Sequence, residues 1–440
     1  MLTELRQVSR QHTLPCMKAS TESTGERVAA KGHFVLELAR ALHTYGTPAH
    51  QLESVLASTA AQLNLQATFF STPTSIMVGI GSIDSQNVHL LRVEPGDPNL
   101  GRLATLNEIM QKVAAGEISP REGLEKIGAL QKEPPQYARW LVLLAFVLAS
   151  GAIASFLQVR AGDVVVASFL GLVTAIVAGA AGSRESTRHV TEPLAAFVVT
   201  TLAFTADGAF GTSSGYITSL AGLVIMLPGF TLTIALTELS TRHLSSGTAR
   251  LSGTLVTFLG LGFGLALGAK TGSIIGRDLQ DWFPALAHVS SRAVLPFWTE
   301  WIALLVAPLA FAVLLQARRR DALPIVVACA AAYLTSKFAG LSMGEELGAF
   351  LGAMVVSAGS NIYAQLKRGA AMVTQVPGLL ILVPGSIGFR SVTSLLGQEV
   401  ETGIATAFRV AIIGISLAAG LLAGNAVTQS GSRSDHRLRI

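Results

Sequence analysis

The sequence has little charge, few aromatic side chains and almost no cysteine. Of its 440 residues, 13% are charged and 6% are aromatic, whereas a soluble domain usually carries about 25% charged residues. The two cysteines, Cys16 in a polar tail and Cys329 in an apolar run, lie in unlike surroundings and predict neither a disulfide nor a metal site. The shortage of charge excludes an ordinary soluble domain.

Motifs for nucleotide and metal chemistry are also missing. The chain has no GxxxxGK(S/T) phosphate loop, no kinase-like motif set and no HExxH or similar histidine array. We therefore expect no cofactor and no metal, and transport would have to be passive or driven by an ion gradient. The pI of 9.4 requires no nucleic-acid partner, because basic residues in the cytoplasmic loops of a membrane protein give the same balance.

Long apolar runs dominate the sequence instead. Hydrophobic residues make up 50% of the chain, and the long runs follow residue 139, whereas the charges concentrate before it. This distribution predicts a polytopic α-helical membrane protein preceded by a small α/β cytoplasmic domain. Residues 1–28 hold no apolar segment of the signal-peptide kind, so we expect a cytoplasmic N-terminal domain and C-terminus and an inner (plasma) membrane location.

The N-terminal part divides into a polar, disordered tail over residues 1–28 and a domain over residues 29–133. A first helix is predicted to end at Gly46, and a second follows Pro48. Ser119 begins a capping box for a last helix. Three β-rich runs with short links predict an antiparallel sheet. The expected helices are 29–45 and 100–114, and the expected strands are 66–71, 74–81 and 87–94.

Ten membrane spans are predicted from Trp140 onward, most with the roughly 17–25 residues that a bilayer requires. Lys and Arg are more frequent in the loops that this order places inside, as the positive-inside rule requires. The expected units are a first repeat over 140–268, an inter-repeat loop over 269–297, a second repeat over 298–425 and a basic tail over 426–440. The expected spans are 140–157, 164–182, 191–206, 215–238, 251–268, 298–316, 323–340, 346–364, 376–396 and 405–425.

An apolar run that ends in Pro-Gly occurs twice. Residues 222–229 read GLVIMLPG and residues 378–385 read GLLILVPG, and the same shift of 156 residues places the GxxxG at 264–268 on that at 420–424. Either break alone is best interpreted as a kink, but paired breaks in corresponding halves favour a transport site between inverted repeats. Five spans per repeat is an odd number, so we predict that the second repeat is inserted upside down.

Polar side chains near these breaks are the candidates for the substrate and ion pathway. Glu238 lies about two turns past the first break, and Arg390 falls well inside the second broken span, where a charge is costly and usually functional. For Glu238, Lys337 and Glu345 a snorkelling or interface-level charge is an equally good interpretation. We predict that loss of Glu238 uncouples transport. The expected pathway residues are Pro228, Gly229, Thr231, Thr233, Glu238, Lys337, Glu345, Glu346, Pro384, Gly385, Ser386 and Arg390.

Taken in order, these motifs resemble the threonine/serine exporter family. The segment 45–53, YGTPAHQLE, is similar to the family's early helix–Gly–helix segment, and 72–76, TPTSI, is similar to its following Pro-Thr strand. The two Pro-Gly spans are similar to its membrane signature, and the resemblance covers roughly residues 29–425. It implies a cytoplasmic domain fused to about ten spans and export of threonine and serine driven by the proton motive force. Similar halves also occur as two subunits linked to succinate export, so the family does not fix the substrate.

The leading prediction is a secondary exporter of small polar metabolites, most of all threonine and serine, and not an enzyme. A dicarboxylate exporter, in which Arg390 and Lys337 bind carboxylates, and a membrane-anchored enzyme with its site in the N-terminal domain are the alternatives. An anchor needs neither ten spans nor paired breaks, and Glu53 and Asp84 are best interpreted as solvated surface carboxylates. The expected partners are a small-molecule substrate, protons and the lipid bilayer, and a homo-oligomer is compatible with the sequence.

Overall fold

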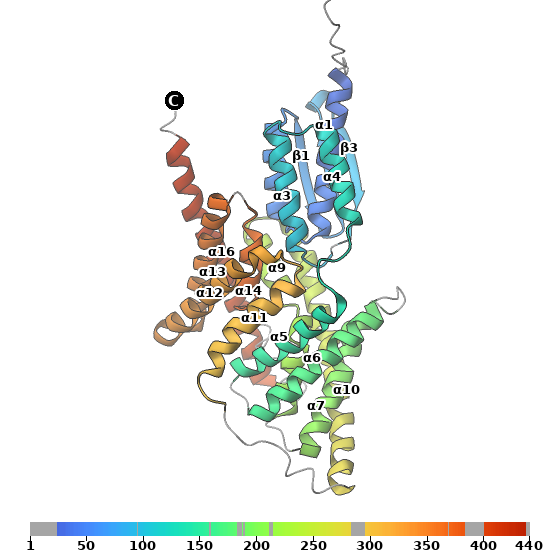
Figure 1. Ribbon diagram of the computed structural model, residues 1–440, viewed down its shortest axis with the longest axis vertical. Coiled ribbons are helices and arrows are strands. Elements are labelled where there is room, and N and C mark those ends of the chain that lie inside the picture. The colour runs from blue at the N-terminus through green and yellow to red at the C-terminus, as the bar shows by residue number, and fades with distance from the viewer. Residues whose placement is uncertain are drawn as a thin grey trace, which may run out of the picture.

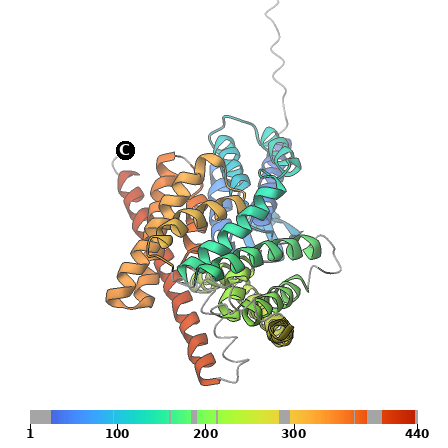
Figure 2. The same cartoon turned by 60° about the horizontal axis from the view of Figure 1, so that its bottom comes forward.

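The computed structural model describes residues 24–94, 96–157, 160–182, 187, 190–210, 214–282, 295–367, 369–382 and 400–436. A small α/β domain, blue in Figure 1, sits on one end of a bundle of helices. Figure 2 shows from a second direction that the last helix runs the length of this bundle. Its C-terminal end points to the same side as the N-terminal domain.

The N-terminal domain packs four helices with a three-stranded antiparallel sheet in the order β1-β2-β3. Phe70 pairs with Met77, which pairs with Leu90 on the third strand, and these three side chains are exposed. Phe34 and Ile76 are fully buried in the core. The predicted antiparallel sheet is thus confirmed. The elements are α1 (Thr24–Thr44), α2 (Ala49–Gln62), β1 (Ala67–Thr72), β2 (Ser75–Ile80), η1 (Ile83–Ser85), β3 (Asn87–Arg92), α3 (Leu100–Ala114) and α4 (Pro120–Lys132).

Local sequence signals set the ends of these helices. Gly46 has a φ of +91°, a left-handed conformation that favours glycine, and α1 ends just before it. The Ser119 hydroxyl accepts a hydrogen bond from the Glu122 backbone N at 3.2 Å and begins α4, as the capping box predicts. The first helix begins earlier than expected, because residues 24–28 of the expected tail are helical. That polar first turn carries no apolar periodicity that would reveal it.

Two sets of helices form the bundle. The first helix set, residues 139–282, comprises α5 (Arg139–Phe156), α6 (Ala161–Gly182), α7 (Thr191–Phe210), α8 (Gly215–Leu223), η3 (Val224–Met226), α9 (Gly229–Ser240) and α10 (Leu244–Trp282). The second helix set, residues 299–436, comprises α11 (Thr299–Leu314), η5 (Arg319–Asp321), α12 (Ala322–Met343), α13 (Glu345–Lys367), α14 (Met372–Leu380) and α16 (Val400–His436).

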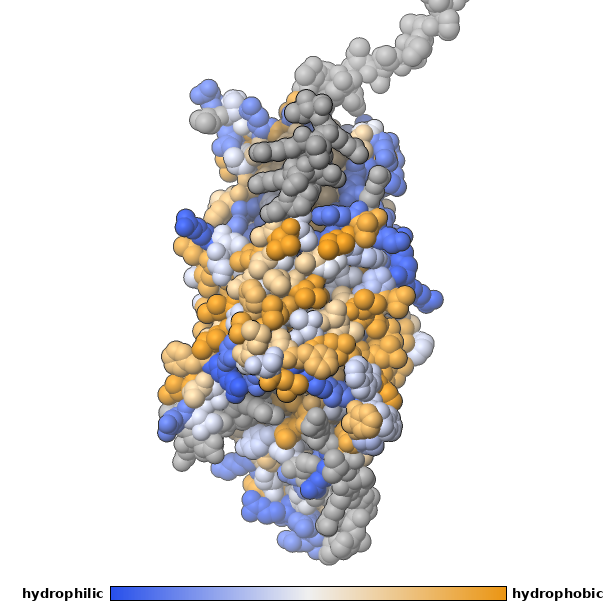
Figure 3. Space-filling view, turned by 90° about the vertical axis from the view of Figure 1, so that its left-hand side faces the viewer, coloured by the Kyte–Doolittle hydropathy of each residue, from blue (hydrophilic) through white to orange (hydrophobic). Residues whose placement is uncertain are grey.

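Large apolar side chains are exposed on most of the long helices of the bundle. Figure 3 shows orange side chains across the middle of one face, with hydrophilic side chains above and below. On α10, Val256, Leu259 and Phe263 are 69%, 70% and 64% exposed. A soluble protein rarely leaves such a continuous apolar surface uncovered. Lipid would cover this apolar surface, so the chain is a multi-pass membrane protein.

The described residues contain fewer candidate spans than the ten expected. Among the described residues, six helices are long and apolar enough to cross a membrane, or seven if the bent pair α8/α9 is one span. The apolar helix α11 has only 16 residues. Ten spans are therefore not confirmed. Most of the expected span 376–396 lies outside the described residues, which stop at Leu382 and resume at residue 400.

The first Pro-Gly break is present in the structure. The helix axis bends by 57° between α8 with η3 and α9, and Pro228 immediately precedes α9. Pro lacks the backbone N–H that would continue the helix, so the chain restarts at Gly229. The second break, at Pro384 and Gly385, falls outside the described residues.

Glycines at four-residue spacing draw α7 and α10 together and lengthen α10. A Cβ at Gly264, Gly268 or Gly272 would clash with a backbone carbonyl oxygen of α7. This close packing continues to Gly276, so α10 runs to Trp282 and residues 269–282, expected in the inter-repeat loop, are helical. The loop was expected there because Lys270 and Arg277 interrupt the apolar run.

The two helix sets repeat the same contacts. A Cβ at Gly222 of α8 would clash with Leu170 and meet Val199, and one at Gly378 of α14 would clash with Val356. Val199 and Val356 are 157 residues apart, almost the shift of 156 that relates the two glycines. The two glycines thus each meet a valine at nearly the same spacing, which is consistent with the predicted internal repeat but does not confirm it. The opposite insertion of the two sets is not confirmed and remains a proposal.

Candidate functional site

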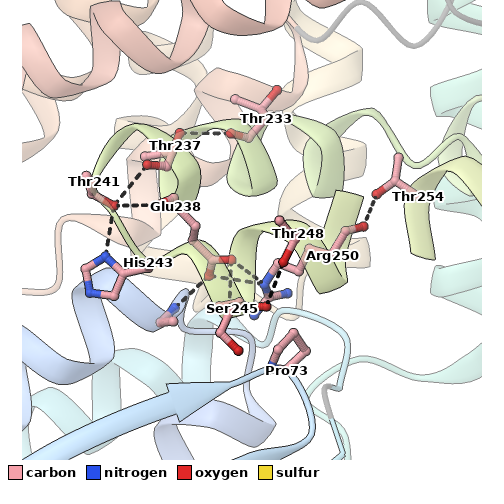
Figure 4. A network of polar contacts seen from close by, with 12 residues as sticks. Pro73, Thr233, Thr237, Glu238, Thr241, His243, Ser245, Thr248, Arg250 and Thr254 are labelled. Carbon is pink, nitrogen blue, oxygen red and sulfur yellow. Dashed lines mark hydrogen bonds and ion pairs between the residues drawn. The ribbon is translucent and has the colours of Figure 1, made fainter. Parts of the chain in front are cut away.

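Glu238 of α9 is a fully buried carboxylate, with 0% of its surface exposed. Its oxygens accept hydrogen bonds from Ser246 Oγ at 2.8 Å and from Arg250 Nε at 3.1 Å, both on α10. A third donor comes from the N-terminal domain, where the Ala49 backbone N lies 2.9 Å from Oε1. Figure 4 shows this network between α9, α10 and the start of α2. Three donors and one counter-charge compensate the desolvation of the carboxylate.

Two histidines of the N-terminal domain lie beside this network, of which His43 is buried and His50 is half-buried. The His43 Nε2 lies 2.9 Å from the Pro73 carbonyl oxygen, and burial lowers the pKa of His43. Burial, and then the nearby His243 and Arg250, lower the pKa of His50 to about 4. Both imidazoles are therefore neutral near pH 7.

A second contact joins the N-terminal domain to the loop between α9 and α10. His243 Nε2 lies 3.3 Å from Glu53 Oε2, and Glu53 Oε1 accepts a hydrogen bond from the Ser71 backbone N at 2.7 Å. The Glu53 side chain is only 22% exposed. Glu53 was expected on the solvated surface, and this expectation is wrong because the docking of the two parts of the chain covers it.

A cavity of about 680 Å³ lies where the N-terminal domain meets the bundle. We call it the junction cavity. None of the described residues that line it is Asp, Glu, Lys or Arg, and about half are polar. These polar residues are Thr47, His50, Gln51, Ser54, Asn107, Thr241, His243, Asn361, Gln365, Gln375, Asn425 and Thr428.

Several of these polar groups are buried and have no hydrogen-bond partner within the described part of the chain. They are Thr47 Oγ1, both ring nitrogens of His50, and Asn107 Nδ2. Buried polar atoms are nearly always satisfied by protein, water or a ligand. Their residues line the junction cavity, so a small movement of these side chains would bring the unpaired groups to a polar solute or to water.

The opposite wall of the junction cavity is an amide cluster from the second helix set. Asn361 of α13 donates to Asn425 Oδ1 of α16 at 2.8 Å, and Ser357 donates to the same oxygen at 2.9 Å. Gln375 of α14 lies 3.4 Å from Ser357 Oγ. Amide groups offer both donors and acceptors, so this wall can meet an ammonium and a carboxylate group without carrying net charge.

A smaller, separate cavity of about 20 Å³ lies deeper in the bundle, beside the junction cavity. Thr233 and Thr237 of α9 and Leu421 of α16 line it. Both threonine hydroxyls donate to carbonyl oxygens of their own helix, at 3.2 and 2.8 Å. We call it the deep cavity, and it lies between the first and second helix sets.

The structure brings only some of the expected pathway residues together. Glu238 and Thr233 lie near the cavities, Pro228 and Gly229 form the break that starts α9, and Thr231 is half-buried on the same helix. The positions of Pro384, Gly385, Ser386 and Arg390 lie outside the described residues.

The other expected charges lie apart from both cavities. Lys337 of α12 pairs with Glu300 of α11, which also accepts a hydrogen bond from Tyr333 at 2.7 Å. Glu345 pairs with Arg409 at 3.0 Å, and both side chains are more than half exposed. Glu346, the next residue on α13, is half-buried. None of these residues lines either cavity.

Sequence reasoning missed His50 and the amide cluster. The signal that could have found the cluster is the presence of Asn361, Gln375 and Asn425 within or at the ends of apolar runs, where a polar side chain needs a partner. Histidine scattered through a sequence carries no such signal. Within the described residues, no group of three or more His, Cys, Asp or Glu is placed to hold a metal ion.

Exposed apolar helices and a broken span together define a multi-pass helical membrane protein. Sequence comparison then gives the family. A model described as a threonine/serine exporter (ThrE) matches residues 33–272, and a second (ThrE_2) matches residues 300–427. The chain therefore belongs to the threonine/serine exporter family.

Curated relatives from yeasts are similar over most of the chain. An uncharacterized protein of Schizosaccharomyces pombe is 25% identical over 84% of this chain and 49% of its own length. Pheromone-regulated membrane protein 10 of Debaryomyces hansenii is 28% identical over 83% of this chain and 37% of its own length. The chain thus spans about half the length, or less, of these relatives. No solved structure matches the chain.

Proposed function

We propose that this chain is a secondary exporter of small, polar, net-neutral solutes, with threonine and serine as the first candidates. The junction cavity carries this proposal, because its described lining combines neutral hydrogen-bonding groups with no Asp, Glu, Lys or Arg. A zwitterion with a hydroxyl side chain needs donors, acceptors and no net counter-charge. Family membership supports the same solute class.

A dicarboxylate is the less suitable solute. Moving two carboxylates out of water requires opposite charges or many donors to offset the desolvation. Lys337, one of the two cations considered for this role, is paired with Glu300 and does not line the junction cavity. We therefore propose that succinate-type solutes are poor substrates.

Energy coupling and orientation are part of the proposal. We propose that the proton motive force drives export, that the two helix sets are inserted in opposite senses, and that the N-terminal domain faces the cytoplasm across a plasma membrane. Substrate would then pass from the junction cavity to the deep cavity as one helix set rocks against the other. Three hydrogen bonds hold the Glu238 carboxylate in place, so we assign it a positioning role.

Efflux from preloaded cells tests this function. Cells with and without the protein are loaded with labelled threonine, serine or succinate, and efflux is followed with and without an uncoupler while ATP is maintained. We expect protein-dependent efflux of threonine and serine, little efflux of succinate, and collapse of concentrative efflux with the uncoupler. Preferred efflux of succinate would reverse the assignment of solute class, and efflux that persists with the uncoupler would exclude proton coupling.

A further inference from the structure

The N-terminal domain is packed into the second helix set. Its hydrophobic core continues without interruption into residues of α11, α12 and α14, including Ile325 and Val376, which are 0% and 3% exposed. The backbone N atoms of Leu100 and Gly101, at the start of α3, donate to the carbonyl oxygens of Leu315 and Gln316 at 2.9 and 3.0 Å. A shared core of this kind resists separation.

Polar contacts strengthen this same interface. Arg318, just after α11, pairs with Glu108 of α3 at 2.6 Å and donates to Thr105 at 2.9 Å. The Tyr137 hydroxyl donates to the Ala317 carbonyl oxygen at 2.7 Å. The domain is covalently continuous with the first helix set through α5, yet its main packing is with the second.

Its contacts with the first helix set are of a different kind. They centre on two polar links, the Ala49 backbone N to Glu238 and Glu53 to His243. Phe230 of α9 is only partly buried against the shared core. Such hydrogen bonds and ion pairs can be replaced by contacts with water, so breaking them costs less free energy than separating a continuous apolar core.

The start of α2, which Glu238 holds, stands between the two cavities. Four residues line both the junction cavity and the deep cavity, namely His50 and Gln51 of α2 and Met372 and Gln375 of α14. Two of the four belong to the N-terminal domain. Movement of that domain away from α9 would therefore widen the connection between the cavities.

We propose that the N-terminal domain moves with the second helix set and that Glu238 is the positioning residue that holds the start of α2 across the solute path. The biological role of this movement rests on the proposed export function. The movement itself is the opening of a connection between the junction cavity and the deep cavity. In the arrangement that the structure shows, the Glu238 carboxylate accepts a hydrogen bond from the Ala49 N–H, and His50 and Gln51 lie between the two cavities. We call this arrangement closed. Release of that hydrogen bond lets α2 leave with the second helix set and exposes the deep cavity.

Accessibility of a cysteine in the deep cavity tests the proposal without any transport assay. Thr233→Cys, in a full-length chain with Cys16→Ser and Cys329→Ala, reports reaction with a hydrophilic maleimide in proteoliposomes. Ala49→Pro removes the N–H that Glu238 accepts, while Pro at the first position of a helix is well tolerated. The preceding Pro48 has a φ of −63° and a ψ of 151°, a conformation that a following Pro permits.

We expect Ala49→Pro to raise the labelling rate at position 233 on the order of tenfold, the effect of losing one hydrogen bond to a charged group. Ala49→Gly keeps the N–H and should leave the rate unchanged. A second test variant, Glu238→Gln with Arg250→Gln, removes both charges together and should also raise the rate. Ser240→Cys, exposed on the same helix, should react equally in every background and so reports unfolding.

Equal rates at position 233 in the parent chain and in both test variants, with Ser240→Cys unchanged, would overturn the proposal. A rate that rises equally with Ala49→Gly would also overturn it, because the N–H would then be irrelevant. Faster labelling in a protein that exports no tested solute would support the release of α2 from Glu238 and reject the proposed export function. The experiment therefore distinguishes a failure of this proposal from a failure of the proposed function.

Discussion

The carboxylate of Glu238 in α9 accepts a hydrogen bond at 2.9 Å from the backbone N of Ala49, which lies 189 residues earlier at the start of α2. A charge inside the bundle is thus satisfied partly by the domain outside it. The first peptide groups of a helix carry unpaired N–H donors and the positive end of the helix dipole, so α2 offers an anion site. The N-terminal domain therefore supplies a hydrogen-bond donor that the Glu238 carboxylate needs, and the bundle supplies the acceptor for the first N–H group of α2.

Removal of the Glu238 carboxylate should destabilise the folded protein. Glu238→Ala leaves Arg250, whose side chain is 14% exposed, without its counter-charge. Breaking a buried ion pair from one side costs about 3–5 kcal/mol. The free energy of unfolding in mixed micelles measures the loss.

Two further variants serve as controls for this measurement. Replacing both partners, Glu238→Met with Arg250→Met, should cost much less than the single change, because no charge is left buried and unpaired. Glu345→Ala breaks an exposed pair with Arg409 and should cost about 0–1 kcal/mol. A single Glu238→Ala variant as stable as the double variant would contradict the buried pair.

Stability should fall in acid because of His50. Burial, then the nearby His243 and Arg250, lower its pKa from 6.5 to about 4, and Glu53 is the carboxylate paired with His243. The unfolded chain therefore binds a proton near pH 6.5 while the folded chain does not. Stability is complete above pH 6.5 and decreases as the pH falls toward 4, by about 3 kcal/mol in total.

His50→Gln removes this titration, so its unfolding free energy should vary less between pH 6.5 and 4 than that of the parent protein. His33→Gln, on the exposed face of α1, is the matched histidine control and should keep the parent profile. Parallel profiles for the parent and His50→Gln would show that His50 is not held neutral by burial.

Local patterns predicted the parts of the fold that local chemistry fixes. The Ser119 cap, the sheet of three short strands and the break at Pro228 each depend on residues close in sequence. The length of α10 was not predicted, because glycine packing on α7 outweighs the charges at Lys270 and Arg277.

The candidate site was predicted only in part, because it too depends on contacts between residues far apart in sequence. Glu238 was identified because a carboxylate within an apolar run is conspicuous. Its partner Ala49 has no polar side chain, and a backbone N–H leaves no mark in the sequence. The burial of His50 also depends on the docking of the N-terminal domain, which no local pattern encodes.

The amide cluster should be required for solute transport more than for folding. Asn361→Leu removes the side chain that donates to both Asn425 and Thr428 in the wall of the junction cavity. Loss of such a hydrogen-bonding group toward the solute costs about 1–3 kcal/mol, which corresponds to roughly 5- to 150-fold in the KM for efflux. Threonine efflux kinetics measure the change, normalised to membrane abundance. Glu346→Gln, elsewhere on α13, is the control, and an Asn361→Leu protein with unchanged KM would remove the cluster from the solute path.

The distribution of Lys and Arg predicts which ends of the helices face the cytoplasm. Single cysteines at Ser245 and Gln365, both exposed, should be protected from an impermeant thiol reagent added outside intact cells. Cysteines at Thr212 and Gln398 should react with it. Lysed cells provide the control, in which the protected positions become reactive. Labelling at Ser245 but not at Thr212 in intact cells would reverse the proposed orientation of the first helix set.

The paired Pro-Gly breaks give the last prediction. Pro228 and Gly229 separate α8 from α9 with a bend of 57°, and this places Thr233 of α9 at the deep cavity. Replacing the pair with Ala-Ala supplies the missing N–H and favours a continuous helix, which satisfies its backbone better in lipid. Straightening should move α9 away from α14, so the protein should insert normally and lose efflux.

The repeat extends this expectation to Pro384 and Gly385. Because α8 and α14 occupy equivalent places in the two helix sets, Ala-Ala at the second pair should reduce efflux about as severely as at the first. Arg390→Ala tests the remaining predicted pathway charge and should weaken the handling of carboxylate groups, because it removes a bidentate donor. Membrane abundance is measured beside efflux in each variant. Normal efflux from well-inserted Ala-Ala variants at both pairs would show that the breaks are kinks, and the solute path would then run elsewhere.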